Sequence, residues 1–286
     1  FPIWNLPLQH PVNLAYEAAT ADLGDVNMID PFHLAAYNET TVNYNRDVEI
    51  FPVLSAIFEQ IIGTCPYKSP TDMGVNMAGN CIVDDQVVCE AARQEIVRRY
   101  YAALCDRRTG AGEDELVYKL ELLMQQAKVD VSIRTVAAAA NAVAEQTGKP
   151  AGAIQLPDGQ VVTGKTTDLM GASSTTLLNA LKQLAGIDHE HHLISREAIE
   201  PIQSVKVANL GSVNPRLHSD ETLIALAISA TANPLARKAL DHLSQLRGCD
   251  AHSTVILSPV DSGLYSRLGL RLTCEPQYET NKLYHK

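Results

Sequence analysis

The sequence has no apolar run long enough to cross a membrane and no segment that marks secretion. No stretch approaches the roughly 18 apolar residues that a membrane-spanning helix needs. The first residues, FPIWNLPLQHP, lack the basic and continuous apolar regions of a signal peptide. They also lack an initiator Met, so we expect a processed or truncated chain. Composition predicts a soluble protein with no membrane partner.

Positive charge is scarce as well. The formal net charge is -10 at pH 7, which opposes binding to a phosphate backbone through clustered Lys and Arg, so nucleic acid is not an expected partner. The 6 cysteines form no C-x-x-C pair, and the chain is far longer than disulfide-stapled scaffolds. These features predict reduced thiols and a cytoplasmic location.

Several catalytic motifs are missing too. The sequence contains neither H-E-x-x-H nor G-x-S-x-G, so it offers no zinc-protease helix and no nucleophile elbow. The densest group of potential metal ligands, Asp188–His192, follows a helix stop at Gly186, and its adjacent histidines diverge on a helix or a strand. We interpret it as a surface loop, expect no metal, and find no residue pattern that specifies a cofactor or a reaction.

At 286 residues the chain is long enough for two domains. Residues 1–130 read as a mainly helical region, whose start is the tail of a missing N-terminal domain. One helix from about Asp85 to Asp106 and another from Glu113 are clear from their apolar period. The second carries a stripe of apolar side chains: Leu116, Leu120, Leu123, Met124 and Ala127.

Residues 131–286 read as an α/β layer fold with a mostly buried sheet. A helix capped by Ser132 ends at Gly148, and the Asp158-Gly159 pair between two β-prone runs predicts a hairpin. A helix that ends near Gly186 follows, then further helices, one of them capped by Ser219. Near the end we expect strands at residues 253–258 and 270–274, joined by a turn.

The stretch GQVVTGKT, Gly159–Thr166, matches the phosphate-loop pattern G-x-x-x-x-G-K-[ST]. A working phosphate loop must follow a strand and open a helix. Here two valines favour extended strand between the glycines, and Gly159 belongs to the predicted hairpin turn. The match is therefore divided between a turn and a strand.

Candidate ligand residues lie where the second hairpin strand leads into the next helix. Free backbone N–H groups and small hydroxyl side chains at a helix start favour an anion. The alternative is that the serines only cap the helix and the lysine is only a solvated strand end. The candidates are Lys165, Thr166, Gly171, Ser173 and Ser174.

Other polar loops offer further candidates. A long loop, residues 69–80, carries Asp72, a guessed acid or base, with Asn76 and Asn80. The loop NLGSVNPRLHSDE places Asn214 and Arg216 ahead of a buried helix, where Arg216 is either an anion-binding fork or a structural salt bridge. Asp261 and Ser262 follow an expected strand, where ligands of α/β sheets commonly bind.

The chain resembles the C-terminal part of a bacterial family catalogued as uncharacterised protein family 0371. The stretches that carry this resemblance include TTVNYNRDVEIFPVL, YKSPTDMGVNMAG, PDGQVVTGKTTDLMGASS and the ending KLYHK. Members are longer at the N-terminus, where a glycine-rich segment ending in Gly-Lys resembles a true phosphate loop.

The resemblance implies a helical region followed by a three-layer α-β-α domain similar to cytidine deaminases. Zinc deaminases need a His or Cys with a Glu two residues later at the helix after the hairpin, and a later P-C-x-x-C. Ser173, Ser174 and Thr175 stand at that helix start, and P-C-x-x-C is absent. We therefore do not expect zinc-dependent deamination.

Two hypotheses of function follow. The first is a cytoplasmic enzyme, or the ligand-binding half of one, that acts on an anionic, phosphorylated or nucleotide-like small molecule, with Lys165 and Arg216 as charge clamps. The second is a non-catalytic helical assembly module of a homo-oligomer. Convergence of the polar loops on one pocket favours the enzyme, whereas scattered loops favour the module.

Overall fold

The computed structural model describes residues 59–61, 63, 64 and 85–279 of the chain. These residues belong to two compact units. The first contains residues up to Ala103 together with Gly112–Ile133, and the second contains Leu104–Ala111 together with the residues from Arg134 onward. The candidates Asp72, Asn76 and Asn80 lie outside the described residues.

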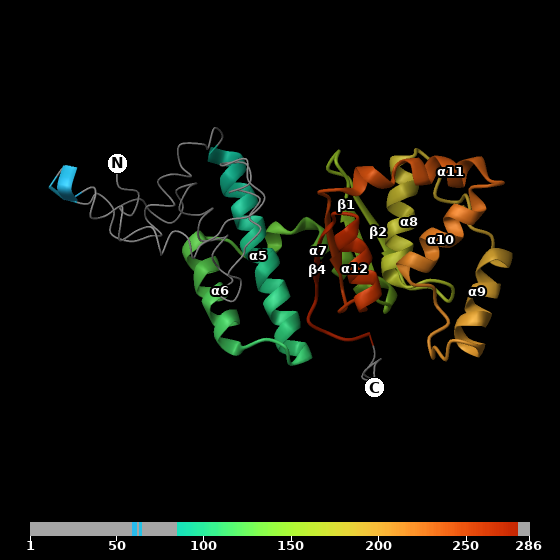
Figure 1. Cartoon of the computed structure of the whole chain (residues 1–286), viewed down its shortest axis with the longest axis horizontal. Helices are drawn as coiled ribbons and strands as arrows, with labels where there is room; N and C mark the ends of the chain where they lie inside the picture. Colours follow the sequence, from blue (N-terminus) through green and yellow to red (C-terminus); the bar gives the residue numbers. More distant parts are fainter. Residues whose placement is uncertain (1–58, 62, 65–84, 280–286) are drawn as a thin grey trace. The chain divides into compact units, whose positions relative to one another are not determined.

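Helices dominate the described part, and a single mixed sheet lies in the second unit (Figure 1). The first helices are α5 (Asp85–Thr109), α6 (Asp114–Ala127), the short 3-10 helix η2 (Val131–Ile133) and α7 (Thr135–Thr147). The hairpin strands β1 (Ala151–Gln155) and β2 (Val161–Lys165) follow. Then come α8 (Ala172–Leu184), α9 (Arg196–Ala208), α10 (Ser219–Ser229), α11 (Pro234–Asp241), η3 (Leu243–Leu246), β3 (Asp250–Ser253), α12 (Pro259–Arg267) and β4 (Arg271–Cys274).

In the first unit, α6 is placed by the apolar period that the sequence displays. Glu113 is its N-cap in an extended conformation, and Asp114 and Glu115 lie in the first turn, where the helix dipole favours negative charge. Of the predicted stripe, Leu120, Leu123, Met124 and Ala127 are buried, and Leu116 is partly buried. The predicted helix and its buried face are confirmed.

The sheet has the strand order β2-β1-β3-β4. Strand β1 is antiparallel to both of its neighbours, while β3 and β4 are parallel, so β2, β3 and β4 all run in the same direction. The Asp158-Gly159 hairpin is confirmed, with Gly159 at a φ of 86°, a conformation that glycine adopts without steric cost. The phosphate-loop match therefore spans a hairpin turn and strand β2.

Helices cover both faces of the sheet (Figure 1). On one face Ala153 packs against Val136 and Ala140 of α7. On the other, Ile154 belongs to the main core with Leu177 and Leu181 of α8. Adjacent residues of β1 thus point to opposite faces, and both faces are buried, as in a mixed α/β fold.

Two glycines let α8 lie close to the hairpin. A Cβ added to Gly152 would come within 2.8 Å of Thr176 Oγ1, and one added to Gly164 would collide with the backbone nitrogen of Thr176. Real Cβ atoms do not approach backbone so closely, so only glycine fits at Gly164 without movement of α8 or β2. Packing against α8 therefore explains the glycine at position 164. The same glycine produces the match to the phosphate-loop pattern.

Several details of the second unit differ from expectation, among them the N-cap of α10, which is His218 and not Ser219. Helix α7 starts after Arg134, because Ser132 belongs to η2 and donates its backbone N–H to Asp130. The strand expected at residues 253–258 is β3 at Asp250–Ser253, since its partner β1 begins only at Ala151. A helix, α12, replaces the expected turn, and this crossover is what allows β3 and β4 to be parallel.

No helix in the part of the chain that the structure describes is both long and apolar enough to cross a bilayer.

We expect the Gly164→Ala substitution to lower the free energy of unfolding by about 1–3 kcal/mol, because the added methyl group overpacks the contact with Thr176. Chemical denaturation of the purified chain measures the change.

Gly263→Ala is the matched control. Gly263 lies within α12, and an added Cβ would meet only Arg267 Nη2, at 3.8 Å. Alanine is the better helix former, so this variant should gain about 0.5–1 kcal/mol. Equal stability of the two variants would show that α8 does not need the close approach at Gly164.

Candidate functional site

The direction of the strands brings several loops to one edge of the sheet. The carboxyl ends of β2, β3 and β4 lie at the edge where the antiparallel β1 begins. Backbone hydrogen bonds join these ends: Thr166 donates to the Pro150 carbonyl at 2.8 Å, and Thr254 donates to the Ala151 carbonyl at 2.9 Å. In α/β sheets this is the edge at which ligands bind.

A cavity of about 600 Å³ lies at this edge. Its lining comes from the segment before β1, the segment after β2, the loop before α10 and the segment after β4. The lining residues are Gly148, Lys149, Pro150, Thr166, Asp168, Val213, Asn214, Pro215, Arg216 and Glu279. Three predicted ligand residues, Thr166, Asn214 and Arg216, therefore meet around one cavity.

Charges of both signs line the cavity. Arg216 Nη1 contacts Glu279 Oε1 at 2.6 Å, so the salt-bridge interpretation of Arg216 holds in this structure. The side chains of Lys149 and Asp168 make no ion pair or hydrogen bond with any residue that the structure describes. The lining thus holds one ion pair, Arg216–Glu279, together with the unpaired charged groups of Lys149 and Asp168.

The loop before α10 is extended where it passes the sheet. Leu217 forms a parallel bridge with Met170, and its side chain is buried in the core. In an extended segment alternate side chains share a face, so Arg216 and His218 both lie opposite Leu217. The arginine of the cavity and the histidine at the start of α10 are therefore presented on the same side.

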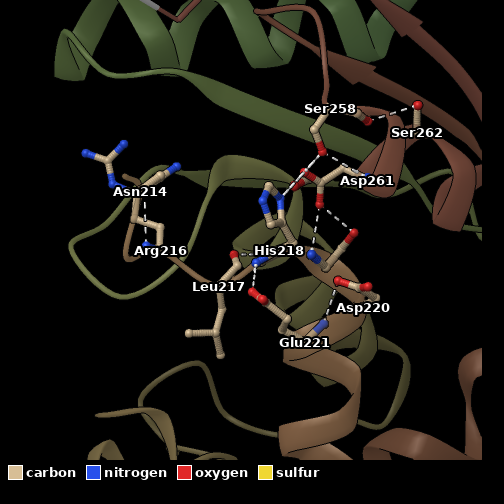
Figure 2. A network of polar contacts seen from close by, with 12 residues as sticks. Asn214, Arg216, Leu217, His218, Asp220, Glu221, Ser258, Asp261 and Ser262 are labelled. Atoms are coloured by element: carbon tan, nitrogen blue, oxygen red, sulfur yellow. Dashed lines mark hydrogen bonds and ion pairs between the residues drawn. The ribbon is translucent and has the colours of Figure 1, made fainter. Parts of the chain in front are cut away.

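His218 contacts a buried carboxylate (Figure 2). Its Nδ1 lies 2.8 Å from Asp261 Oδ2, while Asp261 Oδ1 accepts hydrogen bonds from the backbone N–H and the hydroxyl of Ser219. The Nε2 atom makes no hydrogen bond within the described residues, and Figure 2 shows it turned away from Asp261, toward the side on which Asn214 and Arg216 are drawn. One ring nitrogen is fixed and the other is available.

Ser258 completes the cluster but is not placed as a nucleophile. Its hydroxyl donates to Asp261 Oδ2 at 2.7 Å and lies 3.5 Å from His218 Nδ1, the nitrogen that already faces Asp261. In a serine triad the serine contacts the opposite ring nitrogen from the carboxylate. The arrangement is thus a His–Asp pair suited to proton transfer at Nε2, not a Ser–His–Asp triad.

The pair shifts the pKa values of both groups. The hydrogen bond to Asp261 is the main cause that raises the pKa of His218 above 6.5, against the opposing effect of burial. Burial acts to raise the pKa of Asp261, but hydrogen bonds from His218 and Ser219 outweigh it and hold that pKa well below its usual range. Each group therefore stabilises the charged form of the other, the imidazolium of His218 and the carboxylate of Asp261.

A buried lysine stabilises the loop before α10 through two hydrogen bonds. Lys206 of α9, only 5% exposed, donates from Nζ to the Arg216 carbonyl at 2.8 Å and to Glu221 Oε2 at 2.7 Å. Glu221 Oε2 also accepts the backbone N–H of His218 at 2.8 Å. Lys206 and Glu221 together fix the backbone on both sides of Leu217.

The other predicted ligand residues either take part in packing or lie away from the cavity. Lys165 is exposed at the end of β2 and does not line the cavity, because neighbouring strand residues point to opposite sides. Gly171 is the N-cap of α8, and Ser174 donates to the Leu217 carbonyl. Ser173 is buried, and its carbonyl accepts the Tyr265 hydroxyl.

Asp261 and Ser262 lie in the first turn of α12, not in a turn between strands. The Ser262 hydroxyl donates to the Ser258 carbonyl, as helix serines do, while Asp261 reaches the neighbouring helix α10. Asp261 therefore positions His218, whereas Ser262 forms a hydrogen bond within its own helix.

Sequence reasoning named His218 in its loop but gave it no role, and it missed Ser258, Lys206 and Glu279. A local signal existed for Ser258 and for His218. Ser258 precedes Pro259, the pattern of an N-cap followed by proline in the first helical turn, and Glu221 stands three residues after His218, as in a capping box. Glu279 carries no local signal.

Within the described ranges, no group of three or more His, Cys, Asp or Glu side chains is arranged to hold a metal ion.

Comparison with known proteins shows which family the chain matches. A family model described as "Domain of unknown function DUF1846, N-terminal" matches residues 1–128, and one described as "Domain of unknown function DUF1846, C-terminal" matches residues 132–284.

The chain belongs to the DUF1846 family. It is 57% identical over its full length to a UPF0371 protein of Corynebacterium glutamicum (strain R) and 54% identical to a UPF0371 protein of Streptococcus pneumoniae (strain JJA). The resemblance to family 0371 is thereby confirmed. The chain spans 58% of the length of each of these two relatives.

We expect nuclear magnetic resonance titration to give His218 a pKa above 6.5, and Asp261→Asn to lower that pKa, because an amide cannot stabilise the imidazolium as a carboxylate does. The raised pKa also has a stability consequence. Stabilisation by this group is fully present below pH 6.5 and is lost as the pH rises through the pKa of folded His218.

Asp220→Asn is the control, since it also removes one carboxylate charge near His218, from the first turn of α10. Asp220 Oδ1 accepts the Glu221 backbone N–H and does not contact the His218 ring (Figure 2). The His218 resonance is assigned by its loss in His218→Gln. A His218 pKa at or below 6.5, or equal effects of the two Asn variants, would contradict the pairing.

Proposed function

We propose that this member of the DUF1846 family is the ligand-binding part of an enzyme that performs acid–base chemistry on an anionic small molecule. His218 Nε2 is the proton donor or acceptor in this proposal. The chain spans 58% of the length of the relatives named above, so the proposal concerns the part of the reaction that these residues can carry.

The observation that supports it most is the His218–Asp261 pair, whose histidine stands two residues after Arg216 of the cavity lining. A general acid or base needs a pKa near the working pH, a fixed ring and an open nitrogen. Asp261 raises the pKa of His218 and fixes Nδ1, which leaves Nε2 for a substrate. Asp261 itself touches no ligand in this scheme and is a positioning residue.

The anion is proposed to bind Arg216. One guanidinium nitrogen contacts Glu279, and the remaining N–H groups contact no carboxylate among the described residues, so they can meet ligand oxygens as a fork. We assign the second positive charge to Lys149, which lines the cavity, in place of Lys165, which does not.

The finer fold assignment also remains a proposal. We propose that the second unit is a three-layer domain of the cytidine deaminase-like kind, acting without that family's zinc chemistry and in the cytoplasm. Support comes from the succession of helix α7, hairpin and helix α8, with the two helices on opposite faces of the sheet.

The first test is a thermal-shift screen of anionic metabolites, followed by calorimetry. A ligand at a hundred times its dissociation constant adds about 2.7 kcal/mol of stability. We expect Arg216→Met to weaken the hit at least tenfold, and His218→Gln to retain binding within a few-fold while turnover of a processed hit falls about 10²–10⁴-fold.

Arg237→Met is the control for charge removal, because Arg237 is exposed on α11 and does not line the cavity. Circular dichroism confirms that each variant is folded. A screen without any anionic hit, or a hit that Arg216→Met binds as tightly as the parent, would refute the binding site. Full turnover by His218→Gln would refute the role of the histidine.

A second candidate function, assembly into a homo-oligomer, is favoured by exposed aliphatic side chains on two helices that contact each other. Val205 on α9 is 50% exposed, Leu210 just beyond it 74%, and Ile224 and Ile228 on α10 59% and 60%. Such a surface is suited to a second copy of the chain.

Size-exclusion chromatography with light scattering tests this candidate. We expect an oligomer that Ile224→Lys combined with Ile228→Lys converts to a smaller species, since charge in an apolar interface is costly. Val131→Lys, at an exposed position on η2, should have no effect. A parent chain that is monomeric at high concentration would count against assembly.

A further inference from the structure

The cavity contains a buried hydroxyl group whose hydrogen bonding is incomplete. Thr166 is 3% exposed and lines the cavity, and its Oγ1 has no hydrogen-bond partner in the described structure. Buried polar groups in folded proteins are almost always paired, and an unpaired one costs about 1–3 kcal/mol. A polar group bound in the cavity would give this hydroxyl the partner that the described residues do not supply.

The donors around Thr166 are those that recognise a phosphate group. Arg216 offers the N–H groups that Glu279 leaves unused, and Lys149 offers an ammonium group. Hydrogen bonds from charged donors to phosphate oxygens are short and strong, and the guanidinium can contact two oxygens at once. A phosphate between Arg216 and Lys149 would also meet a neutral donor at Thr166.

The rest of the lining suits hydroxyl groups. The carboxylates of Asp168 and Glu279 can accept hydrogen bonds from hydroxyl groups. The side-chain amide nitrogen of Asn214 can donate one, since the Asn214 side-chain oxygen already accepts the Arg216 backbone N–H at 3.1 Å. A molecule with several hydroxyls supplies both donors and acceptors for these groups.

The apolar lining is too small for a nucleobase. Only Val213 and two prolines, Pro150 and Pro215, contribute apolar side chains, and the lining holds no aromatic ring. Aromatic side chains are the usual partners for stacked bases. The volume of about 600 Å³ lies within the range of sites for small metabolites.

We infer that the cavity binds a sugar phosphate or a similar phosphorylated polyol, with the phosphate on Arg216, Lys149 and Thr166 and the hydroxyls on Asp168, Glu279 and Asn214. This inference rests on the proposed function and names the substrate class of the same site. It also gives the Thr166 hydroxyl its missing partner.

Isothermal titration calorimetry of the full chain tests the inference with ribose 5-phosphate and glucose 6-phosphate as probes. Ribose, inorganic phosphate, adenosine 5′-monophosphate and glutamate are the comparison compounds. We expect at least one sugar phosphate to bind at least tenfold more tightly than every comparison compound. Thr166→Val should weaken that binding about tenfold or more, and Thr166→Ser should restore it.

Thr222→Val is a closely matched control. The Thr222 hydroxyl is also buried and has no hydrogen-bond partner among the described residues, but Thr222 lies in α10 and does not line the cavity. This variant should bind the sugar phosphate as the parent does. Equal losses in Thr166→Val and Thr222→Val would overturn the contact between Thr166 and the ligand.

The outcomes separate the ligand class from the proposed function. If glutamate or the nucleotide binds more tightly than both sugar phosphates, and Arg216→Met abolishes that binding, the polyol phosphate is wrong while the anion site stands. If inorganic phosphate binds as tightly as the sugar phosphates, the hydroxyl contacts are wrong. Binding of none of the probes overturns the sugar phosphate, and the wider anion screen then decides the proposed function.

Discussion

The Asp261 carboxylate joins the first turns of two helices, and the geometry of the site depends on it. One oxygen accepts both the backbone N–H and the hydroxyl of Ser219 at the start of α10, and the other meets His218 and the Ser258 hydroxyl. A carboxylate buried in this way is tolerable only because every contact is a hydrogen bond. The same contacts that offset its burial fix the imidazole, so the stability of the helix junction and the orientation of His218 have one cause.

Around this carboxylate the site is assembled from separate parts of the second unit. Lys206 and Glu221 hold the loop before α10, while the segments after β3 and β4 are joined by the Ile256 N–H donating to the Gln277 carbonyl at 2.8 Å. Lys206 and Glu221 contact the backbone of Arg216 and His218, so the side chains of these two residues stay free for other contacts. Arg216 and His218 can therefore be presented on one side with little freedom, which lowers the entropic cost of binding.

Much of the local structure could be predicted from sequence because its causes are local. The Asp158-Gly159 turn, the α6 stripe and the stop at Gly148 each follow from backbone freedom or apolar period within a few residues. The strand β3 could not, because its sequence, DAHS, is polar and is held only between β1 and β4, where His252 Nδ1 lies 2.8 Å from Thr273 Oγ1. The loops that form the site could be named from the sequence. His218, Lys206 and Glu279 could not be singled out, because their roles depend on contacts between residues far apart in sequence.

The cavity draws its lining from segments as far apart in sequence as Gly148 and Glu279. Contacts between such distant segments form late in folding, because the intervening chain must first be ordered. A ligand that touches all of these segments would therefore bind the folded second unit and not a partly folded one, and it would stabilise the folded form by mass action.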